Sequence, residues 1–590
     1  MEKRDLGTAD QVEVERTLTQ VAKDATLTDE TLNQNALEGT ADEHELTVMD
    51  ALRTYPQAVG WALVSATCVI MEGYDTNLLS NFFAYRKRLD APPPPPRGES
   101  VDHGVKRCVL TAFLATKTAS FLIRYGHFVG VTPETPTGYQ LTPSWQAGLS
   151  QGSNVGSILG CLVSGYLVSK YGSRRVQLGA LLSLTAFIFV VFFAPNLTAL
   201  VIGEILCGFP WGILATTAPA YASEVLPIAL RTYMTSYTNM CFIIGQLISA
   251  GILKGLSTRE DEWGYKIPFA IQWVWPVFLV PLIWFSPESP WYLVRMGRLD
   301  EAEASLRRLQ SPKATNVDPR KTLSVIVYTN NLEKQLRVGT SYWDCFKGTE
   351  LRRTEIACVV FAGQILCGIC FAYNSSYFFS QMGLGTSTTY SLALGGTGLA
   401  FVGCLVNWFV LMPNFGRRTI YVWGMAGMCV VLILIGILNV WTSHYSVALA
   451  QACLTMAWTF IFQLSAGQLG WALPAEMGST RLRQKTICLA RDSSNIMGTI
   501  GGTLQQYFMN PQAWNLKGYT GFFWGGTCFC VFVWSYFRLP ETWNRSYHEL
   551  DVLFAKRVPA RKFASTPVDP FDEHDISKIT GKAQDAADRV

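Results

Sequence analysis

Acidic side chains stand inside two of the long apolar stretches of this sequence. Asp75 lies in the stretch near 57–80, and Glu204 lies in the stretch near 199–222. A carboxyl group is expensive to bury in an apolar segment and usually has a function there, although Asp75 taken alone also fits a helix-end residue that reaches toward water. No paired nucleophile and base, no phosphate-binding loop and no ATPase motif accompany these acids. The pattern therefore does not favour an enzyme.

A second set of charges occurs twice, at matching places in the two halves of the chain. Glu224 precedes Arg231 by seven residues, and Glu476 precedes Arg483 by seven residues. We expect these acids and bases to pair at the inner ends of helices and to hold the halves together as a latch. Each arginine taken singly would only mark the cytoplasmic side of a membrane. The full set is Arg174, Arg175, Glu224, Arg231, Glu288, Arg417, Arg418, Glu476, Arg483 and Glu541.

The elements that carry these charges are long apolar runs. Of 590 residues, 49% are hydrophobic and 16% are charged, whereas soluble proteins have about a quarter charged. Runs of about 18 to 25 residues are long enough to cross a bilayer as helices. Because the charged motifs repeat, we predict an all-α membrane protein with 12 transmembrane helices in two parallel six-helix repeats. The runs lie near 57–80, 147–169, 176–194, 199–222, 235–254, 269–286, 356–380, 391–411, 418–439, 446–470, 487–508 and 520–537.

Composition also limits the partners. A formal net charge of +4 over 590 residues does not indicate a nucleic-acid partner. The 15 cysteines lie mostly in apolar runs, without the spacing of a metal site. We therefore expect no cofactor, no metal and no nucleic acid.

Loop charges predict the orientation, because Lys and Arg gather in the loops that would face the cytoplasm together with both termini. One stretch, at about 86–123, does not fit, since it is basic and proline-rich but would lie outside. We interpret it as a gene-model artefact, with a genuine loop insertion as the alternative. The expected domains are a disordered acidic cytoplasmic tail (1–55), an N-terminal six-helix bundle (56–286), a cytoplasmic linker with intracellular helices (287–355), a C-terminal bundle (356–537) and a cytoplasmic tail (538–590).

Several motifs together resemble one family. Pro-Ala-Tyr-Ala-Ser-Glu-Val (219–225), Pro-Glu-Ser-Pro-Trp-Tyr-Leu-Val-Arg (287–295) and Leu-Pro-Glu-Thr-Trp-Asn-Arg (539–545) resemble the sugar porter family of the major facilitator superfamily. Gly-Tyr-Asp-Thr (73–76) and Thr-Arg-Leu-Arg-Gln-Lys-Thr (480–486) look more narrowly like fungal maltose and α-glucoside permeases. The resemblance covers about 50–560 apart from the insert.

The resemblance implies a sugar site built from amides and one aromatic ring. Uncharged amides donate and accept hydrogen bonds, and an indole offers a flat face to a sugar ring. By family position the site residues are Asn239, Gln246, Gln364, Gln463 and Trp471, with Asn495 as a weaker candidate. For any one amide the alternative is a hydrogen bond that joins two helices, which is common in membranes.

The chain also departs from the family pattern. Ile365 follows Gln364 where a second Gln is usual, and Cys370 stands where an Asn is usual, so the pocket is not expected to be a plain glucose site. Glu204 stands where most sugar porters have an Arg that faces the acid matching Asp75. Two carboxyl groups facing each other in a low-dielectric site should share a proton.

The expected function is therefore uptake of an α-glucoside such as maltose, coupled to protons, by a monomer in the plasma membrane. The alternatives are a porter or facilitator for another sugar (hexose, lactose or cellodextrin) and a sugar sensor that does not transport. The sugar, the proton and the lipid bilayer are the expected partners.

Overall fold

The structure is a computed structural model. It describes residues 29–84, 124–125, 127–128, 139–256, 263–311, 317–335, 340–375, 378, 386–441, 445–509 and 513–566. The basic insert expected at about 86–123 lies outside these residues.

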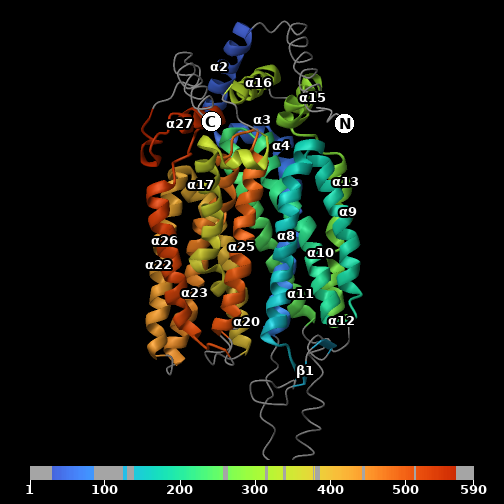
Figure 1. The fold of residues 1–590 in the computed structure, drawn as a ribbon, viewed down its shortest axis with the longest axis vertical. Coiled ribbons are helices and arrows are strands. Elements are labelled where there is room, and N and C mark those ends of the chain that lie inside the picture. Colours follow the sequence, from blue (N-terminus) through green and yellow to red (C-terminus); the bar gives the residue numbers. More distant parts are fainter. Residues whose placement is uncertain are drawn as a thin grey trace, which may run out of the picture.

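Helices of the first half of the chain form one side of an elongated helical bundle (Figure 1). Two expected spans are each divided into consecutive helices, α4 with α5 and α12 with α13, and the other four are single helices. A core of buried apolar side chains that runs from Cys68 to Ile283 lies among them. The helices are α4 (Pro56–Thr67), α5 (Ile70–Ala84), α8 (Pro143–Tyr171), α9 (Ser173–Phe192), α10 (Leu197–Val225), α11 (Ile228–Leu256), α12 (Trp263–Ile271) and α13 (Val274–Trp284).

Helices of the second half form the other side, around a core of their own that runs from Ile356 to Phe563 (Figure 1). α17 is interrupted by the π-helical turn η3, where Gly368 has a φ of 98° that favours glycine. The elements are α17 (Gly348–Gln364), η3 (Ile365–Ile369), α18 (Cys370–Tyr373), α20 (Thr386–Val406), η4 (Asn407–Leu411), α21 (Met412–Asn414), α22 (Arg417–Leu438), η5 (Asn439–Trp441), α23 (Tyr445–Leu464), α24 (Ala466–Met477), α25 (Arg483–Met509), η6 (Lys517–Tyr519) and α26 (Thr520–Arg538).

Length and composition qualify eight segments of the described residues to cross a membrane. They are Ser173–Phe192, Leu197–Val225, Ile228–Leu253, Trp263–Trp284, Gly348–Tyr373, Leu394–Asn414, Arg417–Trp441 and Ser446–Met477. α8 and α25 are not among them, because polar residues interrupt their apolar runs. These two helices lie side by side between the halves, so their polar residues face protein rather than lipid (Figure 1).

Close helix packing within the first half depends on glycine. A Cβ atom on Gly156 of α8 would lie 1.9 Å from the carbonyl oxygen of Ile205, and one on Gly208 of α10 would lie 2.2 Å from that of Ser153. The two backbones are therefore in direct contact, as small residues permit in membrane proteins.

The short helices that lie outside the two sets of long helices gather at one end of the bundle, which we call the tail end (Figure 1). They are α2 (Asp29–Glu45), α3 (Val48–Thr54), α14 (Pro290–Arg295), α15 (Leu299–Leu309), α16 (Pro319–Gln335), η2 (Tyr342–Phe346), α27 (Tyr547–Ala555) and η7 (Ala560–Lys562).

One expectation about the fold needs correction. Residues 29–54 were expected in a disordered tail but form α2 and α3, which are docked on the rest of the protein through fully buried Ala36 and Ala51. The expectation of an all-α fold is confirmed for the described residues; the short strand β1 (His127–Phe128), which pairs antiparallel with β2 (Tyr139–Gln140) near the opposite end of the bundle, does not change the fold class.

Candidate functional site

Two of the expected sugar-site amides meet between the halves of the molecule. Asn239 on α11 donates through Nδ2 to Oε1 of Gln463 on α23, over 2.7 Å. Both side chains are buried. The bond joins the first half to the second, so these amides serve here as the helix-joining contact considered above. Gln246 lies two turns beyond Asn239 on the same helix and is half-buried.

Gln364 occupies the last residue of α17, directly before the π-helical turn. Its Nε2 donates to the carbonyl oxygens of Ala466, at 2.9 Å, and Gly467, at 3.0 Å, in the first turn of α24. A Cβ atom at Gly470 would lie 2.2 Å from this nitrogen, so the glycine leaves room for the Gln364 side chain in this position. With the nitrogen engaged, the side-chain oxygen is the atom left to accept from a ligand.

Trp471 on α24 is 4% exposed, and protein atoms cover most of its ring. The ring centroid of Phe361 lies 5.1 Å from that of Trp471 in an edge-on arrangement. The guanidinium of Arg491 lies 4.9 Å from the indole centroid, a cation–π contact. Asn495 is farther along α25 and donates to Ser157 Oγ on α8, over 3.0 Å. It therefore joins helices and is not brought together with Trp471 by any contact described.

The two acids singled out in the sequence face each other, as expected. Asp75 on α5 and Glu204 on α10 are both 1% exposed and interact through their carboxyl groups. Gln272 donates through Nε2 to Asp75 Oδ1, over 2.5 Å. The other three carboxyl oxygens are buried without a hydrogen-bond donor in the part of the chain that the structure describes. A proton held between the two groups would satisfy that need, since two ionised carboxylates at this site would repel each other.

A second charged contact within the helices was not predicted from the sequence. Glu72, one turn before Asp75 on α5, forms an ion pair with Arg491 on α25, which links the two halves. Both side chains are 11% exposed. The available signal was a basic residue inside the apolar run near 487–508 and a second acid inside the run near 57–80.

The latch residues lie at the tail end, but their partners differ from the expected arginine–glutamate pairs. Backbone N–H groups bind two of the acids: Ser173 donates to Glu288 over 2.9 Å, and Arg418 donates to Glu541 over 3.2 Å. These acids lie against helix N-termini, where unsatisfied N–H groups attract carboxylates. Arg174 and Arg418 donate to backbone carbonyls through their side chains, and Arg175 is exposed.

One chain of hydrogen bonds crosses between the halves at this end. Arg417 donates to Thr232 Oγ1 over 2.7 Å, and Thr232 in turn donates to Glu476 Oε1 over 2.6 Å. Glu224, the counterpart of Glu476, accepts from Ser289 Oγ at 2.5 Å and from Arg295 Nη2 at 3.2 Å. Thr232 of the first half therefore links Arg417 and Glu476 of the second half, in place of a direct ion pair between arginine and glutamate.

The two repeated arginines meet on a tyrosine of the short helix α27. The guanidinium carbons of Arg231 and Arg483 lie 3.8 Å and 3.6 Å from the ring centroid of Tyr547 on α27. Two guanidinium groups at such distances must occupy opposite faces of the ring. Arg483 is fully buried, and its three side-chain nitrogens have no hydrogen-bond partner among the described residues. Tyr547 donates its hydroxyl to the carbonyl oxygen of Ser223, over 3.1 Å.

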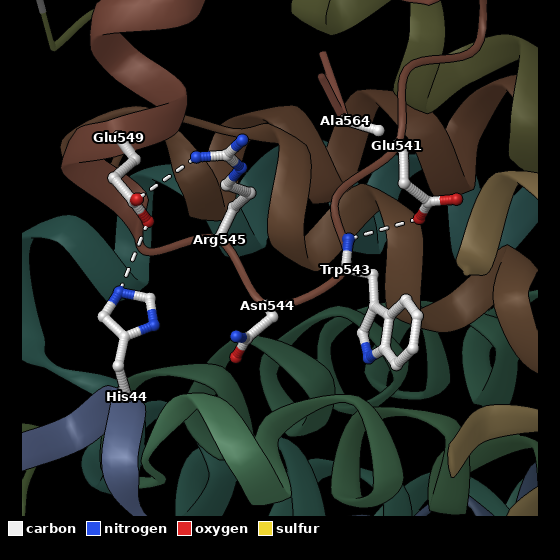
Figure 2. Close-up of a pocket in the computed structure, with 7 residues that line it drawn as sticks. All are labelled: His44, Glu541, Trp543, Asn544, Arg545, Glu549 and Ala564. Atoms are coloured by element: carbon white, nitrogen blue, oxygen red, sulfur yellow. Dashed lines mark hydrogen bonds and ion pairs between the residues drawn. The ribbon is translucent and has the colours of Figure 1, made fainter. Parts of the chain in front are cut away.

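α2 also contacts α27 at the tail end. Figure 2 shows His44 of α2 facing Glu549 of α27, at 3.5 Å, with Arg545 on the other side of the carboxylate. The hydrogen bond to Glu549 raises the pKa of His44 above its usual value of 6.5. Burial opposes ionisation of Glu549, but the hydrogen bonds from His44 and Ser546 lower its pKa to about 2. Beside this pair lies a cavity of about 500 Å³ that Trp543 and Glu541 also line (Figure 2).

Glu43, next to His44, binds the start of α11. Its Oε1 accepts from the backbone N–H of Ile228, over 2.9 Å, and lies 3.9 Å from Arg231 Nη2. α2 thereby joins the repeated motif of the first half to α27.

Comparison with known proteins gives concordant results. The family model described as "Sugar (and other) transporter" matches residues 61–554. Maltose permease MAL61 of Saccharomyces cerevisiae is 36% identical over 543 residues, which are 91% of this chain and 82% of the relative. The α-glucosides permease MPH3 of the same yeast (strain YJM789) is 36% identical over 544 residues, which are 91% of this chain and 84% of the relative.

Solved structures share the fold at low sequence identity. The proton:xylose symporter XylE bound to 6-bromo-6-deoxy-D-glucose, of the major facilitator superfamily, has a TM-score of 0.65 at 18% identity and covers 84% of this chain and 99% of its own. The inward-open conformation of XylE from E. coli has a TM-score of 0.56 at 18% identity, with the same coverage.

Proposed function

Because the chain belongs to the sugar transporter family and is a multi-pass membrane protein, we propose that it takes up an α-glucoside such as maltose together with protons, by alternating access. The observation that carries the proposal is the 36% identity to a maltose permease over 91% of the chain. The tail end would face the cytoplasm of a cell whose plasma membrane holds the protein.

The sugar would bind between the halves, near the break in α17. Gln364 Oε1 would accept from a sugar hydroxyl, because its nitrogen is engaged by α24. The hydrogen bond between Asn239 and Gln463 spans the halves, so it would break as they move apart. Each amide would then bind a sugar hydroxyl group in place of the other amide. Trp471 is buried in this conformation, so movement of the halves would have to uncover one face of its ring, which would then stack on an apolar sugar face while Arg491 contacts the indole.

Proton coupling would reside in the Asp75–Glu204 pair. The pair holds one proton while it is buried, because three of its oxygens have no donor. Hydration of the site in another conformation would allow both groups to ionise, which releases the proton. The Glu72–Arg491 ion pair lies one turn away and spans the halves, so its rupture would accompany the same movement.

At the tail end, the Arg417–Thr232–Glu476 chain and the Tyr547 contacts would keep the cytoplasmic side closed. Opening this side must break them, since each joins elements from different parts of the chain. This assigns the latch function to hydroxyl and ring contacts as well as to the charged motifs.

The test is uptake in a yeast that lacks its own glucoside transporters. We expect accumulation of labelled maltose or another α-glucoside, abolished by a protonophore. Uptake of hexose, lactose or cellodextrin in place of α-glucosides would assign a different sugar. Uptake that ignores protonophores and external pH would assign a facilitator, and surface protein without any uptake would favour a sensor.

A further inference from the structure

Hydrogen bonds between α8 and α25 form an interhelical ladder from the interior of the molecule to the tail end. Asn495 donates to Ser157 over 3.0 Å, and Gln484 donates to Ser164 over 3.1 Å. Lys485 donates to Ser169 over 3.0 Å. Because α8 belongs to the first half and α25 to the second, the ladder closes the boundary between them.

Asp492 of α25 lies within this ladder but, unlike Asn495, Gln484 and Lys485, forms no described hydrogen bond with α8. It lies between Asn495 and Gln484 on α25 and is 5% exposed. Both of its carboxyl oxygens are buried, and no described residue forms a hydrogen bond with them. A carboxylate without a donor is costly in such a place, whereas the protonated acid carries its own donor.

Among the described residues, the groups around Asp492 do not supply a strong free donor. Across the boundary the Cys161 thiol of α8 faces it, and a thiol is a weak donor. Tyr342 of η2 also lies nearby, but its hydroxyl donates to the carbonyl oxygen of Leu162, over 2.7 Å. The thiols of Cys358 on α17 and Cys488 on α25 are neutral neighbours. The nearby cation, Arg491, is paired with Glu72.

We propose that Asp492 is a proton-binding residue of the transport cycle, separate from the Asp75–Glu204 pair. It holds a proton while α8 and α25 are in contact. When the halves separate and water reaches the boundary, the O–H bond breaks and the proton passes to water, leaving a hydrated carboxylate. Rebinding of one proton from water restores the acid before the ladder closes. The proposal rests on the proposed alternating-access transport.

Linkage gives this residue a measurable effect. If the closed ladder requires the proton, then high pH must oppose closure. The two events are linked, so proton binding and closure change each other's equilibrium constant by the same factor. One titrating group changes such an equilibrium by about tenfold per pH unit on the alkaline side of its pKa. Maltose exchange between equal concentrations, which needs the halves to move but no net proton flux, should therefore slow at alkaline pH.

The experiment compares purified full-length proteins in liposomes, with the same pH on both sides. Labelled maltose exchange is followed from about pH 5 to about pH 9, a range that brackets the usual and buried carboxyl pKa values. The variants are Asp492→Asn, which keeps the shape and adds donors, and Asp75→Asn, which removes the other proton site. We expect the wild type and Asp75→Asn to lose severalfold in rate at alkaline pH, and Asp492→Asn to lose little.

An alkaline decline that persists unchanged in Asp492→Asn would overturn the proposal. Asp492→Ser provides a second neutral variant if the first does not assemble, and Asp492→Glu should retain the decline. Wild-type protein that does not exchange maltose at any pH would instead contradict the proposed function, so the two failures are distinguishable.

Discussion

At the residue scale, Trp471 shows both what sequence reasoning can predict and what it misses. Its place near a sugar site follows from family position, but the cation on its ring does not, because Arg491 is twenty residues away and on another helix. We predict that Trp471→Ala raises the KM for uptake at least tenfold, since ring stacking contributes about 1–3 kcal/mol. Surface protein should be unchanged. Trp471→Phe, which retains a ring, is the matched control and should cost much less. An unaltered KM in the alanine variant would remove Trp471 from the pocket.

Glu204 allows a second prediction at this scale. Its carboxyl group faces Asp75 in a buried site, so replacing it with Gln removes the repulsion that favours a shared proton. Glu204→Gln should therefore shift the pH optimum of uptake rather than only scale the rate. Asp75→Asn should abolish uptake against a gradient and spare some exchange. The pH profile of initial uptake rates measures the first effect. A profile that only changes in height would make the pair structural.

Glu72 and Arg491 mark the limit of single-sequence reasoning for this site. Asp75 and Glu204 were predicted to face each other because a family position suggested it, and they do. Nothing in the spacing of Glu72 and Arg491 indicates that residues 419 positions apart form a pair. Such contacts depend on how the halves dock, which a periodic pattern within one helix does not encode.

At the element scale, α27 contributes to the packing of the tail end, because its Tyr547 separates two buried guanidinium groups. Removal of its ring should bring Arg231 and Arg483 into direct repulsion and weaken closure of the tail end. Cation–π contacts contribute about 0.5–2 kcal/mol each, so we predict that Tyr547→Ala raises the KM for external sugar severalfold. Tyr547→Phe keeps the ring and loses only the hydrogen bond to Ser223, so it should resemble the wild type. Equal effects of both variants would show that the hydroxyl, not the ring, matters.

α2 gives a pH-dependent prediction at the same scale. Because the folded-state pKa of His44 is raised above 6.5 by Glu549, the pair stabilises the docked helix fully below about pH 6.5 and loses this contribution as pH rises through the folded value. Amide hydrogen exchange in Asp29–Glu45, corrected for intrinsic rates, should therefore quicken on passing from pH 6 to pH 8. His44→Gln should remove the pH dependence. Protection that does not change with pH in the wild type would mean that Glu43 and Lys321 hold α2 without His44.

At the scale of the whole molecule, the order and type of the long helices could be predicted because apolar runs and repeated motifs are local properties. The points at which helices are interrupted could not be predicted from the sequence. The turn at Gly368 and the division between α23 and α24 involve contacts between distant residues, such as the bond from Gln364 to Gly467. The helix in 29–45 was missed for a similar reason: its sequence is polar, and contacts with α16 and α11, such as Lys321 with Glu38 and Ile228 with Glu43, hold it.

The contact between α2 and α27 brings two distant parts of the chain together at one end of the bundle. Fluorescent donor and acceptor groups attached to exposed positions on these helices would thus sit close together in the described conformation. If opening of this end separates the elements, energy transfer between the dyes would fall with each cycle. The transporter would then report its own turnover optically, without a labelled sugar.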